Sequence, residues 1–214
     1  MHALELHFDI WEIGTEYINA EHHHFSAPEK ALIRTFVEDR WEADIVANDI
    51  HVCWVDYQPY RSAKEMRLAF QKTNQLLISI LGNVKAGDDH PLTPELNLKH
   101  RAIHDRHHVI LGAGFNAPGE ICASAHMINL AREAGYSMFV QQYLFSDMIG
   151  ATGHFYVCGG QYASQNKIVL FEPELIDELV ELYMELGPTA LMDYLAPIDQ
   201  AARERHGWTT RSAH

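Results

Sequence analysis

The chain has 214 residues, of which 47% are hydrophobic and 21% are charged. These values are close to those of globular proteins and exclude a disordered or fibrous chain. Asp and Glu outnumber Lys and Arg by 29 to 16, and the resulting formal charge of −13 argues against nucleic acid or an anionic membrane as the main partner. The length indicates a single domain over residues 1–214, with residues 1–25 as a candidate extended appendage.

The cysteines and the apolar segments bear on cellular location. Cys53, Cys122 and Cys158 are an odd number of cysteines without CxxC spacing, and we expect reduced thiols. No apolar stretch approaches the ~18 residues that a membrane span needs, and the N-terminal run does not resemble a signal peptide. We therefore expect a cytoplasmic protein, and peripheral membrane contact and a homodimer both stay open. Histidine is the outlier, with 15 residues, and it directs the search for function.

The first half of the chain mixes helical and extended signals. Within residues 1–19, apolar and polar side chains alternate from Leu4 to Ile10, which favours a strand, although a helix fits as well. A capping box with proline in the first turn predicts a helix over 26–47. The β-prone residues 48–60 indicate a short strand or an extended crossing segment. A second capping box predicts a helix over 62–83 that ends at Gly-Asn, and a loop follows.

The second half of the chain is predicted to be mainly helical. Proline near the start and glycine at the end delimit helices over 94–111 and 120–134. A further helix is expected over 137–150, and residues 153–170 are expected to form a loop crossing or a small hairpin. A strongly amphipathic helix over 173–187 precedes one or two short helices and a frayed end. The predicted fold class is a mostly α, bundle-like domain with minor extended segments.

One histidine-rich segment within the helix 94–111 contains the strongest candidates for a functional site. His104 and His108 lie four residues apart and therefore share one helix face. Asp105 sits one residue round the helix, still within reach of a metal on that side. Glu120 begins the next helix after a Gly-rich turn and is a candidate fourth ligand. Imidazole and carboxylate together suit zinc, iron or manganese; the competing interpretation is a solvated polar helix face.

The order His104-Asp105-x-x-His108, eleven residues, then Glu120 resembles the metal motif of the coenzyme Q (ubiquinone) biosynthesis protein 4 family. The resemblance covers residues 94–135, and the chain is similar to a distant member. It implies that these four residues bind a metal, usually taken as zinc, within an all-helical fold. It also implies oxidative decarboxylation at ring carbon C1 of a prenylated aromatic precursor, and in some members a scaffold role toward other coenzyme Q enzymes.

Two more residues of the same helix are candidates for catalysis. Arg101 lies three residues before His104 on the same face, where it could pair with a substrate carboxylate. It could equally pair with Glu95 or another surface acid. His107 adjoins the ligands but is rotated away from them, so it is either a partner of a ligand or an exposed residue.

Three residues further along are candidates for binding a small aromatic or prenylated, quinone-like ligand. His154 could enter a pocket from a loop, although a single histidine is more often a hydrogen-bonded structural residue. Gln142 and Tyr143 lie in an apolar helical context, where they could donate hydrogen bonds to a polar substrate or satisfy neighbouring groups.

The sequence leaves three functions open. The first is a metal-dependent enzyme that acts on an aromatic or quinone-precursor ring, with decarboxylation as the expected reaction. The second is a non-catalytic protein in which the metal joins two helices and an apolar pocket binds a lipid or quinone, or in which the chain serves as a scaffold. The third is a metal-dependent hydrolase, which would need a further His and a further Asp from distant positions.

Overall fold

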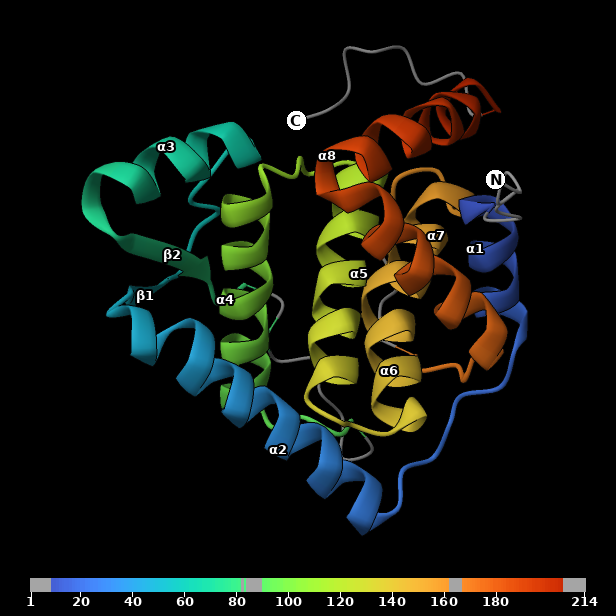
Figure 1. Cartoon of the computed structure of the whole chain (residues 1–214), viewed down its shortest axis with the longest axis horizontal. Coiled ribbons are helices and arrows are strands. Elements are labelled where there is room, and N and C mark those ends of the chain that lie inside the picture. The colour runs from blue at the N-terminus through green and yellow to red at the C-terminus, as the bar shows by residue number, and fades with distance from the viewer. Residues whose placement is uncertain (1–8, 82, 84–89, 162–166, 206–214) are drawn as a thin grey trace. The chain divides into compact units, whose positions relative to one another are not determined.

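The structure is a computed structural model that describes residues 9–81, 83, 90–161 and 167–205 (Figure 1). Among these residues helices dominate, and the β structure is one small two-stranded sheet, which confirms the predicted mostly α fold class. The chain divides into two compact units, His24–Phe115 and the combination of Met1–His23 with Asn116–His214. No linker-like composition marks these boundaries in the sequence. Within the described ranges, no helix has both the length and the apolar character needed to cross a bilayer.

The unit His24–Phe115 contains, in chain order, α2 (Ala27–Asp44), the 3₁₀ helix η1 (Val46–Asn48), β1 (His51–Val55), α3 (Ala63–Thr73), β2 (Gln75–Ser79) and α4 (Pro94–Leu111) (Figure 1). Helix α4 is its centre, since it contacts α2, α3 and β2. The two strands are parallel and α3 connects them, with His51 opposite Gln75 and Val55 opposite Ser79.

The capping box at the start of α2 forms as predicted. Ser26 Oγ accepts a hydrogen bond from the Glu29 amide at 3.4 Å, and the Glu29 carboxylate accepts one from the Ser26 amide at 2.7 Å. These bonds satisfy amide groups that have no partner within the helix. The helix therefore begins where the sequence indicates, and its buried side places Ile33 and Phe36 in the core.

The predicted helix over 62–83 is wrong in its second half. Helix α3 ends at Thr73, and Asn74 adopts a left-handed conformation with φ of 50°. The chain then enters β2, where Leu76 and Ile78 are buried. A short apolar run fits a buried strand as well as a helix by periodicity alone, and pairing with β1 decides between them. The prediction of an extended segment within 48–60 is confirmed by β1.

The other unit contains α1 (Ile10–Asn19), α5 (Ala117–Glu133), α6 (Met138–Leu144), the π-helix η3 (Phe145–Gly150), α7 (Ala151–Val157) and α8 (Pro173–Arg205) (Figure 1). Helix α5 is buried along most of its length and contacts α6, η3 and α8. Helix α8 contains a non-helical break at Gly187, with φ of 73°. That break confirms the predicted end of the amphipathic helix 173–187.

The expected N-terminal strand is a helix over residues 10–19. The Asp9 side chain caps α1 by accepting a hydrogen bond from the Trp11 amide at 2.7 Å. Ile10, Ile13 and Tyr17 lie on the buried face at helical spacing. Residues 1–8, which hold most of the alternating pattern, lie outside the described residues.

Helix α7 occupies the start of the segment that was expected to be a loop crossing or hairpin. The helical path continues from α6 through η3 without ending at Gly150. Gly150 and Gly153 lie within this helical path at points where α1 packs closely against it. A Cβ on Gly150 would meet the Tyr17 ring, and a Cβ on Gly153 would meet the backbone of α1. Glycines needed for packing thus resemble helix stops in the sequence. Residues 162–166 and the tail 207–214 lie outside the described residues.

Candidate metal centre

Helix α4 holds the two histidines of the motif on one face. The Thr93 hydroxyl caps its start by accepting from the Leu96 amide at 3.3 Å, and Gly112 ends it with φ of 68°. Between these ends, His104 and His108 lie one turn apart. Their Nε2 atoms are 3.0 Å from each other, and the ring planes meet at 86°. The prediction that these two histidines share one helix face is confirmed.

The ring of His108 is oriented by its surroundings. Its Nδ1 lies 3.4 Å from the carbonyl oxygen of Ala113, and the Phe115 ring contacts it edge-on at 5.3 Å between centroids. A carbonyl oxygen only accepts hydrogen bonds, so Nδ1 carries the proton in this arrangement. The Nε2 atom therefore presents its lone pair toward His104, which is the tautomer that a metal-binding histidine needs.

The spacing of the two nitrogens matches that of metal ligands. Two nitrogens at about 2.05 Å from a tetrahedral ion are about 3.3 Å apart, and at an octahedral right angle they are about 2.9 Å apart. The measured 3.0 Å between His104 Nε2 and His108 Nε2 lies between these values. The pair could hold a divalent ion with shifts of a few tenths of an ångström, and the spacing alone does not select the metal.

Helix α4 also contributes to a buried charge network centred on Asp44 at the end of α2. Asp44 accepts from Arg40 at 2.6 and 2.9 Å, from Arg106 at 2.9 Å, and lies 3.2 Å from His107 Nε2. Burial raises the pKa of Asp44, but hydrogen bonds from His107 and Arg40 outweigh it and hold the pKa well below its usual range. Because His107 is fully buried against Asp44, it ties α2 to α4 in this structure.

Arg101 and Asp105 are two further candidate site residues on α4. The guanidinium of Arg101 donates from Nη1 to the carbonyl oxygen of Leu81, just beyond β2, at 3.2 Å. Asp105 is half-buried, and its negative charge adds to the burial that raises the pKa of Tyr60. Both residues are thus within the same unit as the histidine pair.

Glu120 belongs to the other compact unit, where it stands in the first turn of α5. The Asn116 side chain caps this turn by accepting from the Gly119 amide at 3.1 Å, and the Tyr156 hydroxyl accepts from the Ala117 amide at 3.1 Å. The Ser124 hydroxyl donates to the carbonyl oxygen of Glu120 at 2.6 Å. These bonds fix the backbone that carries the half-buried Glu120 carboxylate.

The three candidate ligand-binding residues, all in the unit that contains α5, have structural contacts. Gln142 donates from Nε2 to the carbonyl oxygen of Phe171 at 2.7 Å, which ties the helix to the segment before α8. The Tyr143 side chain is fully buried, and this burial raises its pKa well above the ordinary value. His154 lies on α7, where its ring contacts Cys158 and the carbonyl group of Gln161.

Two of these interactions do not follow from the sequence pattern. Asp44 and His107 are 63 positions apart, and no local pattern connects them. His154 and Cys158 are four residues apart, but the predicted loop or hairpin over 153–170 does not place them on one face. The helix α7 brings them together through its i, i+4 spacing.

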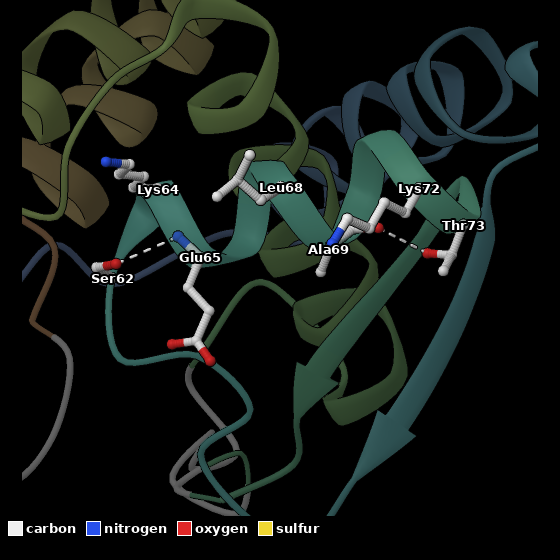
Figure 2. Close-up of a pocket in the computed structure, with 7 residues that line it drawn as sticks. All are labelled: Ser62, Lys64, Glu65, Leu68, Ala69, Lys72 and Thr73. Atoms are coloured by element: carbon white, nitrogen blue, oxygen red, sulfur yellow. Dashed lines mark hydrogen bonds between the residues drawn. The ribbon is translucent and has the colours of Figure 1, made fainter.

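An open hollow lies on the outer face of α3 (Figure 2). In Figure 2 the Ser62 hydroxyl accepts from the Glu65 amide at 3.2 Å, and the Thr73 hydroxyl donates to the Ala69 carbonyl oxygen at 2.9 Å. The lining residues come from this one helix and its cap and include none of the predicted site residues: Ser62, Lys64, Glu65, Leu68, Ala69, Lys72 and Thr73. The hollow therefore does not support the predicted quinone-binding pocket.

Comparisons with known proteins found no relative of this chain. No protein-family model, no curated protein and no solved structure matches the chain. Function is therefore argued from the residues and their geometry.

Proposed function

We propose that His104, His108 and Glu120 bind one divalent metal ion. Each residue offers one ligand atom, so the set provides two imidazole nitrogens and one carboxylate oxygen and could hold a metal ion. The observation that carries the proposal is the histidine pair, with Nε2 atoms 3.0 Å apart and the tautomer of His108 set by the Ala113 carbonyl group. Such mixed nitrogen and oxygen donors suit zinc, and also iron or manganese.

Three protein ligands are typical of catalytic rather than structural zinc sites, since the fourth position stays open to water or substrate. We therefore extend the proposal to a metal-dependent enzyme. A divalent ion bound there supplies Lewis-acid chemistry, which stabilises negative charge on a phenolate or carboxylate. Asp105, the fourth predicted ligand, would bind weakly or add to an expanded coordination shell.

The reaction we propose is decarboxylation, oxidative or not, of an aromatic ring acid related to quinone precursors. Its support is the resemblance of the motif to the coenzyme Q biosynthesis protein 4 family, together with a cation on the same helix face. Arg101 already orients one N–H group toward Leu81; its other N–H groups would pair with the substrate carboxylate. His107 would act indirectly, because its contact with Asp44 fixes the position of α4.

Elemental analysis of untagged full-length protein tests metal binding. We expect close to one divalent metal per chain in the wild type and almost none in the His104→Ala/His108→Ala double variant. Glu120→Gln should lower the affinity about 10- to 100-fold or more. The matched control is His51→Ala, because His51 is exposed on β1 and should leave the metal content unchanged. An absence of metal from wild-type protein after reconstitution would refute the site.

The reaction is tested separately. Metal-loaded protein is incubated with prenylated and unprenylated hydroxybenzoic acids carrying a labelled carboxyl group, with and without oxygen, and released CO2 is counted. We expect release that the double variant abolishes and that Arg101→Gln weakens mainly through a higher KM. If the metal-loaded wild type releases no CO2 from any of these acids, the decarboxylase assignment fails although the metal site stands.

A further inference from the structure

The end of α7 brings a thiol and an imidazole together. Cys158 follows the last helical residue of α7, and its Sγ lies 3.5 Å from Nε2 of His154, one turn earlier. The Nδ1 atom of the same ring is 3.1 Å from the carbonyl oxygen of Gln161. The three groups form a row of thiol, imidazole and carbonyl oxygen. This is the order in which a base accepts a proton from a nucleophile while a third group orients it.

The carbonyl oxygen of Gln161 sets the state of the ring. Because that oxygen only accepts, Nδ1 of His154 carries the proton and Nε2 presents its lone pair to the thiol of Cys158. The S–H group therefore donates to a nitrogen that is able to take the proton. The reverse tautomer would place two acceptors against each other and leave the base unavailable.

The helix packing holds this ring in place and leaves Cys158 partly exposed. The Tyr17 ring of α1 contacts His154 edge-on, with centroids 6.0 Å apart. Burial raises the pKa of Tyr17, so its phenol stays neutral beside the imidazole. On the other side, Cys158 is only partly buried, so part of this residue is exposed to solvent.

We infer that Cys158 and His154 form a reactive-thiol site that exchanges with low-molecular-weight disulfides, independently of the metal centre. In this step the S–H proton of Cys158 moves to Nε2 of His154, and the sulfur attacks one sulfur of the small disulfide. A new S–S bond forms, the original S–S bond breaks, and the departing thiolate takes the proton from His154. Cys158 is oxidised to a mixed disulfide, and the small disulfide is reduced to one equivalent of thiol.

The other two cysteines provide internal controls. Cys122 is fully buried, burial raises the pKa of its thiol to about 12, and it should not react in the folded protein. Cys53 is partly buried like Cys158, but its sulfur contacts the amide nitrogen of Gln75 at 2.9 Å rather than a base. Cys53 is therefore a comparison of similar exposure without a histidine.

The test measures thiol exchange in fully reduced, untagged, full-length protein with chelator present. The probes are dithiobis(nitrobenzoate), which releases a coloured thiolate, and oxidised glutathione, with peptide mass spectrometry to assign each cysteine. We expect Cys158 to react at least about tenfold faster than Cys53, and about tenfold more slowly in His154→Gln than in the wild type. Cys53→Ser should keep the fast phase and Cys158→Ser should abolish it.

Three results would overturn the inference. The first is a wild-type Cys158 that reacts no faster than Cys53, a comparison that needs no substitution and so does not depend on how a variant folds. The second is an unchanged rate for Cys158 in folded His154→Gln, which would mean that the imidazole does not act as the base. A fast phase that appears only after metal is added would also contradict it, because the proposed step needs none.

Discussion

Replacing Gly153 by alanine tests how tightly α1 and α7 are packed. A Cβ at this position would lie 2.7 Å from the amide nitrogen of Gly14, 2.8 Å from its Cα and 2.9 Å from the carbonyl oxygen of Ile10. All three are backbone atoms of α1, so no side chain can rotate away. Carbon atoms in contact prefer about 3.5–4.0 Å, so the helices would have to separate by about 0.7 Å or more.

That separation sets the expected loss of stability. Overpacking of this kind costs about 1–3 kcal/mol, and a gap of this size weakens the dispersion contacts of the buried α1 residues as well. Alanine regains up to about 1 kcal/mol because it favours a helix more than glycine does. We expect Gly153→Ala to lower the free energy of unfolding by about 2 kcal/mol, measured as a lower denaturant midpoint with an unchanged m-value.

The control substitution is Ala151→Ser, two residues earlier on the same helix and only partly buried. It changes helix propensity without entering the close approach, and the expected cost is about 0.5 kcal/mol. If Gly153→Ala unfolds at the same midpoint as the wild type or at a higher one, α1 and α7 are not in the tight contact described here.

Two further predictions concern charge and metal. Asp44→Asn should cost about 3 kcal/mol at pH 7, because Arg40 and Arg106 lose their buried counter-charge. The folded-state pKa of Asp44 is below its unfolded value of about 3.9, so its stabilisation holds above that value and is lost as the pH falls through the folded-state pKa. In acid-titrated denaturation curves the wild type and this variant should therefore begin to converge below about pH 4 and meet only below the folded-state pKa; a constant gap would contradict the assignment. Chelator should lower the melting temperature of the metal-loaded wild type by about 5 °C or more and leave His104→Ala/His108→Ala unchanged. Equal melting curves of the wild type with and without chelator would argue against a bound ion.

The parts of the molecule that local chemistry determines were predictable from the sequence. The caps at Thr93 and Asn116 and the glycine at 112 delimit α4 and α5, and the spacing of His104 and His108 then places both on one face. By contrast, β2 was predicted as helix because its apolar run satisfies both periods, and only its partner β1 distinguishes them.

Long-range pairing explains what was missed at the site. The Asp44–His107 contact joins two helices that no spacing rule relates, so the burial of His107 could not be foreseen. The substrate residues were chosen for their polar side chains within an apolar context. In the structure, Gln142 holds the Phe171 backbone and Tyr143 fills the core, because buried polar groups are usually used to satisfy neighbours.

The π-helix η3, over Phe145–Gly150, sets the orientation of the helix that follows it. A π turn closes its hydrogen bonds one residue later than an α turn, so it holds more residues per turn. In a regular α-helix each residue turns the chain by about 100°. The residues of α7 therefore face other directions than they would in an uninterrupted α-helix of the same sequence. Because α7 follows η3 directly, the side of α7 that meets α1 at Gly153 depends on this π turn.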